Sequence, residues 1–435
     1  MIYLDHAATT PVPRPVADAM YEVLTEQFGN PSSQYPLGLE MKRRVESWRR
    51  TVAGALGCDA KQLFFTSCGT EADNWAVTAA CWQNRHLGKH IVTTAVEHSA
   101  VLEACRWMER QGYEVTYLAP AQDGSITAEQ VLSAVRPDTA LVSCMLVNNE
   151  LGNIYPIAEI AKGLAARNPQ TLLHTDAVQG FLKVPCSAKA LGADFITISA
   201  HKIGGPKGIG ALYIGQRVKN PKPLLAGGEQ ESGLRAGTEA TAQIAGFAKA
   251  VELRLEHLED KLRHMAEIRD YAVELLSAIP DLKILSAPGG APHVLSVSLV
   301  GWPSQNIVND LGQQHFRRLR LPSGQAQPRH RRFEAAEEGL RRRHPPELRP
   351  GDHQGRHRRL RGRPSAASRH PDADAVRQFH FSEWKRFRFY ASSSSPGARF
   401  LQAAVPPGPA ADPAESHHHL PGVCGHLHGG NAGSE

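Results

Sequence analysis

Short apolar runs alternate with longer helical patterns through about the first 312 residues of this 435-residue chain. Helical patterns occupy Glu71–Trp82, Ala100–Gln111 and Ile157–Arg167, between several of these runs. Because strands that alternate with helices form parallel sheets covered on both faces, we expect an α/β fold with a mostly parallel sheet. The expected strands are Leu63–Thr66, His90–Thr94, Glu114–Leu118, Leu141–Val147, Thr171–His174, Asp194–Ser199 and Ala211–Ile214.

A change of pattern near residue 255 suggests a second, smaller domain. A long helical pattern with possible breaks covers Thr238–Ala278, and a strand at Val294–Val300 and a helix at Ser304–Leu311 follow. We therefore expect a large domain over residues 15–255. A smaller α/β domain should combine residues 1–14 with residues 256–314 and be truncated there.

Beyond residue 314 the composition changes abruptly. There is no isoleucine after Ile307, Lys385 is the only lysine, and fifteen arginines fall between Arg317 and Arg363. No period of 2 or 3.6 residues is sustained there. Two interpretations of residues 315–435 stay open: a disordered basic tail, which could bind nucleic acid, or a stretch translated out of frame.

The apolar runs, the N-terminal pattern and the cysteines indicate the cellular compartment. No apolar run reaches the ~20 residues that span a bilayer, and the N-terminus lacks the pattern of a signal peptide. The seven cysteines are scattered and form no CxxC pair, which is typical of a reducing compartment. We expect a cytoplasmic protein with no membrane contact and no metal site.

The strongest chemical signal is a lysine at the end of an expected strand. Lys202 follows Ser199 and His201 and enters the glycine-rich loop IGGPKGIG. Its amine could form an imine with an aldehyde cofactor such as pyridoxal 5'-phosphate (PLP). On this motif alone, a solvated lysine would be the more common case.

A carboxylate precedes that lysine by one strand. The run TLLHTDAVQ places Asp176 just past an expected strand, with Gln179 three residues later. PLP requires a carboxylate at its pyridine nitrogen, and the carboxyl end of a strand is the expected position for it. Asp176 alone could equally cap a helix, but with Lys202 one strand later the cofactor interpretation is the better one.

Three further features complete the candidate site. Gly69 and Thr70 stand where a strand passes into a helix, which suits a phosphate group. His98, in a turn, could stack on a pyridine ring and move protons. Asn149 follows another strand and could reach the ring or the substrate. Each is weak evidence alone, because threonine often caps a helix and a lone histidine is usually structural.

Taken together, these motifs resemble the cysteine desulfurases of the NifS/IscS type, within the PLP-dependent class V aminotransferase family. The resemblance covers roughly residues 1–312 in the expected order. Its pieces are YLDHAATTP from Tyr3, FGNPSS from Phe28, FTSCGTEADN from Phe65, EHSAV from Glu97, VNNELGNIYPI from Val147, HTDAVQ from His174, SAHKIGGPKGIGALY from Ser199 and GGEQESGLRAGTE from Gly227.

The resemblance implies PLP fold type I and a role for each matching residue. Lys202 would carry PLP as a Schiff base and, with His98, shuttle protons. Asp176 would pair with the pyridine nitrogen and Gln179 with the ring hydroxyl, while Asn149 lies near the ring and the substrate carboxylate. The implied phosphate ligands are Gly69, Thr70, Ser199 and His201, completed by Thr238 from the neighbouring subunit of a homodimer.

The implied reaction converts free L-cysteine to L-alanine. An enzyme cysteine takes the sulfur as a persulfide and passes it to an iron–sulfur scaffold or another acceptor. That cysteine and a substrate-binding arginine are expected beyond residue 314, and the segment 319–325 has no cysteine. Cys424 lies near several histidines, but their spacing matches no standard metal site.

An alternative reading frame restores part of the missing pattern. One base later, residues 315–322 permit ISVASGS, residues 325–330 permit KRSHV, and residues 345–354 permit LR followed by SFGPETT. Other functions stay open for the chain as written: another class V PLP lyase such as a selenocysteine lyase, or an inactive PLP-binding remnant. Nucleic-acid binding is the less favoured role for the basic tail.

Overall fold

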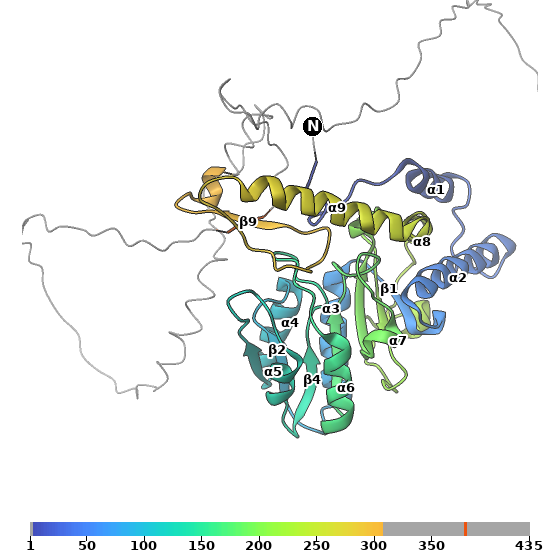
Figure 1. Ribbon diagram of the computed structural model, residues 1–435. Helices are drawn as coiled ribbons and strands as arrows, with labels where there is room; N and C mark the ends of the chain where they lie inside the picture. The colour runs from blue at the N-terminus through green and yellow to red at the C-terminus, as the bar shows by residue number, and fades with distance from the viewer. Residues whose placement is uncertain (1–2, 308–377, 381–435) are drawn as a thin grey trace, which may run out of the picture. The chain divides into compact units, whose positions relative to one another are not determined.

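Seven strands form one sheet, in the order β1-β7-β6-β5-β4-β2-β3 (Figure 1). The pairs β2/β3, β2/β4, β4/β5 and β5/β6 are parallel, whereas β7 runs antiparallel to β1 and β6. The predicted mostly parallel α/β sheet is therefore confirmed. The strands are β1 Leu63–Thr66, β2 His90–Thr94, β3 Glu114–Leu118, β4 Thr139–Ser143, β5 Leu172–Asp176, β6 Phe195–Ser199 and β7 Gly210–Ile214.

The computed structural model describes residues 3–307 and 378–380, all within the unit Met1–Arg386. No helix in this described part is long and apolar enough to cross a membrane. The α-helices are α1 Arg14–Thr25, α2 Pro36–Leu56, α3 Gly69–Gln83, α4 Ser99–Arg110, α5 Ala128–Ser133, α6 Ile157–Arg167, α7 Ala188–Leu191, α8 Thr241–Leu255 and α9 Leu258–Ser277.

Both faces of the sheet are buried, because successive strand side chains point to opposite faces. Phe64 belongs to the apolar cluster beneath α3 and α4, and Phe65 belongs to the cluster that includes residues of α2, α6 and α8. The strand residues of β2, β4, β5 and β6 are all buried. Continuous apolar runs are typical of strands covered on both faces.

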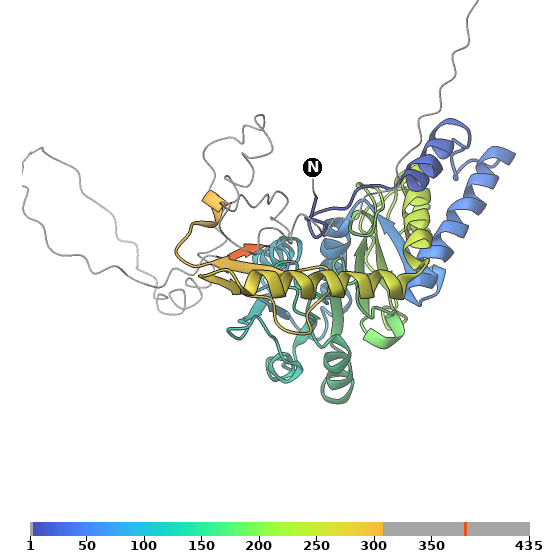
Figure 2. The same cartoon turned by 45° about the horizontal axis from the view of Figure 1, so that its top comes forward.

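The long helical pattern beginning at Thr238 is two helices. Helix α8 ends at Leu255 and α9 begins at Leu258, and between them His257 adopts a left-handed φ of 55°. Helix α9 leads to a small antiparallel sheet of β8 (Leu282–Ile284), β9 (Ser296–Leu299) and β10 (Gln378–His380) (Figure 2). The break coincides with the domain boundary expected at residue 255, which stays a prediction.

Strand β4 ends four residues earlier than predicted, at Ser143. Residues 144–147 are still buried, and two of them keep backbone hydrogen bonds to β5 beyond the end of β4: Cys144 N donates to His174 O and Leu146 N to Asp176 O. Burial and continued contact with β5 therefore explain the length of the apolar run. The predicted helix Ser304–Leu311 extends beyond the described residues, and of the predicted tail 315–435 only Gln378–His380 is described.

We expect Trp75→Ala to destabilise the fold strongly. Trp75 in α3 is fully buried, meets Phe64 edge-on and donates from Nε1 to Lys222 O over 2.8 Å. Removing such a side chain costs about 3–5 kcal/mol, which a urea unfolding curve would register as a lower midpoint. The matched control is Trp107→Ala, since Trp107 is 51% exposed; equal shifts for both variants would contradict this account of the core.

Candidate active site

A pocket of about 450 Å³ gathers nine of the ten predicted site residues. The tenth, Thr238, instead lines a separate cavity of about 210 Å³. Asp5, Ala7, Ala8, Asp73 and Met145 also line the pocket and were not predicted. The nine are Gly69, Thr70, His98, Asn149, Asp176, Gln179, Ser199, His201 and Lys202.

The sheet topology explains why these residues meet. Asp176 is the last residue of β5 and Ser199 the last of β6, and these strands are parallel neighbours. His98 caps α4 shortly after β2, and Asn149 follows β4. The carboxyl ends of parallel strands share one edge of a sheet, which is where ligands bind in open α/β sheets.

Lys202 ends a short 3-10 helix, Ala200–Lys202, directly after β6. Its Nζ donates to Ala7 O over 2.5 Å and to Ala8 O over 3.0 Å. Burial lowers the pKa of this amine, although Asp176 and Asp5 oppose the shift. A lowered pKa leaves more of the unprotonated amine, which is the nucleophilic form.

Residues 5–10, the N-terminal strip, lie against the site. Ala7 O accepts a second hydrogen bond from Gln179 Nε2 at 2.8 Å. Thr10 Oγ1 donates to His201 O and accepts from Gly204 N. The predicted assignment of residues 1–14 to the small domain did not anticipate these contacts, although the DHAATT motif was a signal that the strip mattered.

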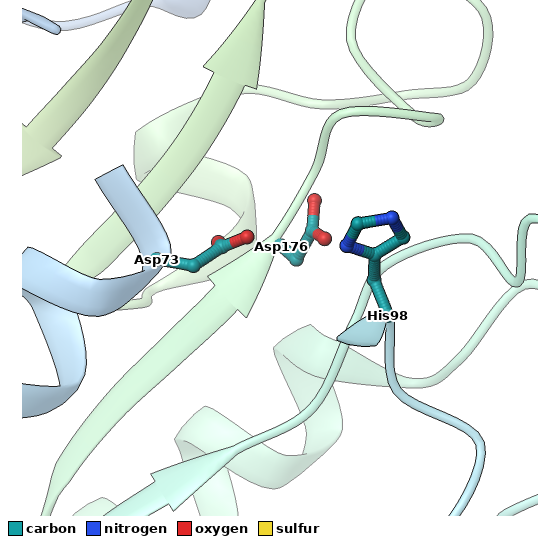
Figure 3. A group of neighbouring side chains, drawn as sticks. All are labelled: Asp73, His98 and Asp176. Atoms are coloured by element: carbon teal, nitrogen blue, oxygen red, sulfur yellow. The ribbon is translucent and has the colours of Figure 1, made fainter. Parts of the chain in front are cut away.

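Two buried carboxyl groups and an imidazole, which all line the pocket, lie close together (Figure 3). One ligand atom each of Asp73, His98 and Asp176 lies within 4.8 Å of the other two. Asp176 accepts a hydrogen bond from Val178 N at 2.9 Å. Burial, followed by the nearby charge of Asp73, raises the pKa of Asp176 to about 7. This carboxyl group can therefore gain or lose a proton near neutral pH.

Asp73 is the residue that sequence reasoning missed. It lies one helical turn after Gly69 on α3, so the two residues share a helix face. Burial raises the pKa of Asp73 to about 7 as well. The ring of His174 lies 3.4 Å from Asp73 and is neutral, because burial lowers its pKa to about 4. The i, i+4 spacing from the expected phosphate loop was the available signal.

One end of the pocket is suited to an anion. Gly69 opens α3, and helix starts present unpaired backbone N–H groups. A side chain at Gly69 would place its Cβ 2.9 Å from Val178 Cγ2, so only glycine fits without a shift. Ser199 Oγ is buried and has no hydrogen-bond partner within the described residues. A buried hydroxyl without a protein partner is expected to form a hydrogen bond to a ligand.

His201 and His98 differ in their surroundings. Burial, and then nearby lysines led by Lys202, lower the pKa of His201 to about 4, so its ring is neutral at pH 7. Its Nδ1 lies 3.2 Å from Thr9 Oγ1. His98 is exposed, and its Nδ1 accepts from Ala100 N at 3.2 Å. Because Nδ1 accepts, the proton of this tautomer is on Nε2.

Comparison with known protein families and sequences gives a consistent result. Residues 2–338 match the family described as aminotransferase class-V. "Cysteine desulfurase IscS" of Methanosarcina thermophila is 45% identical over 310 residues, which are 71% of this chain and 72% of that protein. "Cysteine desulfurase" of Nostoc sp. is 44% identical over 285 residues, 65% of this chain and 70% of that protein.

Solved structures agree with the sequence comparisons. A "NIFS-like protein" has a TM-score of 0.69 at 36% identity, over 72% of this chain and 86% of its own. "SspA in complex with cysteine" has a TM-score of 0.63 at 30% identity, over 78% of this chain and 92% of its own.

We expect Asp73→Asn to lower the pKa of Asp176 in the ligand-free protein. The substitution removes a nearby negative charge, which favours the charged form of the remaining carboxyl group. Carboxyl ¹³C NMR titration would measure the midpoint. Asp194→Asn is the control, because Asp194 is buried and has a raised pKa but is absent from the charges that act on Asp176. An unchanged midpoint in Asp73→Asn would show that the charge of Asp73 does not raise the pKa of Asp176.

Proposed function

Because this chain belongs to the aminotransferase class-V family, we propose that it is a PLP-dependent cysteine desulfurase. It converts L-cysteine to L-alanine and passes the sulfur on for iron–sulfur cluster assembly. The observation that carries the proposal is a single pocket with three features. It holds the Lys202 amine, whose pKa is lowered, the buried Asp176 carboxyl group, and the end suited to an anion where α3 begins. The relatives named cysteine desulfurase support the same conclusion.

The residues that line the pocket offer a candidate partner for each polar group of PLP. Ser199 Oγ, Thr70 and the N–H groups that open α3 would hold the phosphate, with neutral His201 beside them. Asp176 would hold the pyridine nitrogen and Gln179 the ring hydroxyl. Lys202 would carry the cofactor through its Nζ.

When bound, PLP supplies an electron sink for the substrate Cα. Asp176, as a carboxylate, would accept a hydrogen bond from the protonated pyridine nitrogen and so keep the proton on the ring. Lys202 Nζ, once released, would move a proton at the substrate, and His98 would act as the second proton carrier at the exposed side of the site. Asn149 would orient the substrate.

The sulfur acceptor is a separate question from the cofactor site. Burial raises the pKa of Cys58 and of Cys186 to about 12, so both remain thiols at neutral pH and are poor nucleophiles. The segment 319–325, where the family cysteine was expected, lies outside the described residues and contains none. Cys68 is a free cysteine that lines the pocket directly before α3. We infer that the described residues carry at least the cofactor and proton-transfer half of the reaction.

A cytoplasmic homodimer is the proposed state of the protein. Thr238 is exposed and lines a cavity apart from the pocket of its own chain. A second subunit would bring another copy of Thr238 to that pocket.

Lys202→Ala should abolish the visible absorbance of the PLP Schiff base, since no other pocket residue carries an amine. Lys207→Ala is the matched control, because Lys207 is an exposed lysine of the same glycine-rich loop and does not line the pocket. Absorbance would be recorded after reconstitution with PLP and gel filtration. Retention of the signal in Lys202→Ala would refute the assignment of the lysine.

L-cysteine should perturb the Schiff-base absorbance and yield alanine when a soluble thiol is supplied in excess. One thiol takes the sulfur as a persulfide, and a second reduces that persulfide to sulfide and is itself oxidised to the disulfide. Alanine is measured by amino-acid analysis and sulfide by methylene blue. L-selenocysteine serves as the competing substrate, and alanine formed only from it would favour a selenocysteine lyase. A Schiff base with no response to either amino acid would indicate the inactive remnant.

A further inference from the structure

A loop at residues 229–240, the Thr238 loop, is anchored to its own subunit while Thr238 remains exposed. Thr238 shares its cavity with Phe65, Ser67 and Gly208, and is absent from the lining of the pocket that contains Lys202. The loop therefore presents this hydroxyl away from its own candidate active site.

The first anchor is a buried ion pair between Arg49 of α2 and Glu231 of the loop. Arg49 Nη1 donates to Glu231 Oε2 at 2.6 Å, and Nη2 donates to Oε1 at 2.9 Å. The side chains are 9% and 2% exposed, respectively. A bidentate pair fixes direction as well as distance, because the planar guanidinium matches the carboxylate plane.

The same pair covers the free edge of the sheet. Among the strands that the structure describes, β1 is the outermost of its sheet and pairs only with β7. On this strand Phe65 N donates to Glu231 Oε2 at 2.9 Å, and Leu63 O accepts from Arg49 Nη1 at 2.9 Å. The ion pair thus takes the place of a neighbouring strand along an otherwise unpaired edge.

The second anchor joins the loop to the first turn of α3. Arg235 Nε donates to Glu71 Oε1 at 2.9 Å, and Ser67 Oγ donates to Glu71 Oε2 at 2.5 Å. Glu71 follows Gly69 and Thr70, the residues that open the anion site. The Thr238 loop is therefore attached on both sides of the strand-to-helix turn after β1.

The loop backbone requires this support. Glu231 and Ser232 have φ values of 48° and 59°, consecutive left-handed conformations at non-glycine residues. Such conformations cost energy and persist only where surrounding contacts hold them. The buried Glu231 carboxylate, with three donor atoms around it, is the contact that does so.

We propose that Glu231, held by Arg49, is a positioning residue that orients Thr238 toward the phosphate of the cofactor in the neighbouring subunit. This inference rests on the proposed function, because it takes Thr238 as a phosphate ligand across a homodimer. It assigns to Glu231 an effect on the partner's pocket rather than on its own.

Affinity for PLP, measured by titrating the Schiff-base absorbance, tests the proposal. Thr238→Ala and Glu231→Gln should each weaken binding about tenfold to a hundredfold, the loss expected for one hydrogen bond to a charged group. Glu46→Gln is the matched control: Glu46 is the other carboxylate on Arg49, at 3.2 Å, but it is 46% exposed and holds no loop. It should leave the affinity unchanged.

The phosphate role of Thr238 and the positioning role of Glu231 are contradicted by different results. If Thr238→Ala leaves the affinity unchanged, the phosphate role of Thr238 in the proposed function is wrong. If Thr238→Ala weakens binding and Glu231→Gln does not, the positioning role is wrong. A double variant, Arg49→Met with Glu231→Leu, leaves no buried charge unpaired. It also removes the side-chain partners of Phe65 N and Leu63 O, so we expect a lower urea midpoint but a folded protein, checked by circular dichroism. The folded double variant should bind PLP weakly, and wild-type affinity there would overturn the proposal.

Mixed dimers, made by co-expressing two differently tagged chains, separate the two subunits. Pairing a Lys202→Ala chain with a Glu231→Gln chain leaves one pocket with Lys202, served by an intact loop, and should bind PLP with wild-type affinity. Pairing a Lys202→Ala, Glu231→Gln chain with a wild-type chain should give weakened binding. The opposite order would show that Glu231 acts on its own pocket and would overturn the proposal.

Discussion

Burial of carboxyl groups at the carboxyl ends of the strands is the constraint on which the site depends. Asp176 and Asp73 lie close together in the pocket, and no arginine or lysine within the described residues forms an ion pair with either group. Burying two negative charges side by side is costly, so the pair holds protons up to near-neutral pH. A cationic ring nitrogen placed beside Asp176 would relieve that cost, which links the electrostatics of the two carboxyl groups to the proposed cofactor.

Much of this arrangement could be predicted from the sequence, because strand ends carry the chemistry. The expected strands at residues 63–66, 90–94 and 114–118 match the structure, and the chain order of the motifs brought nine predicted residues into one pocket. Local patterns sufficed there, since each motif follows its own strand. The family and fold class inferred from those motifs are confirmed by the comparisons.

The features of the fold and the site that were not predicted depend on contacts between distant segments, and local sequence patterns do not contain such contacts. Asp73 resembles any polar helix residue until α3 is packed against the sheet. Residues 144–147 stay buried and keep hydrogen bonds to β5 beyond the end of β4, so the apolar run alone did not show where the strand ends. The pairing of Arg49 with Glu231 joins residues 182 positions apart. Neither residue belongs to a hydrophobic pattern that would predict the pair. Such pairs are visible only once the edge of the sheet is known.

The N-terminal strip has a consequence for how the protein is made. Ala7 and Lys202 are separated by 195 residues, yet the carbonyl of one holds the amine of the other. During synthesis the strip leaves the ribosome long before its partners in β5, β6 and the following turn exist. It must therefore wait for most of the sheet to form before it can dock. The strip is translated before its partners, yet it can complete the site only after them.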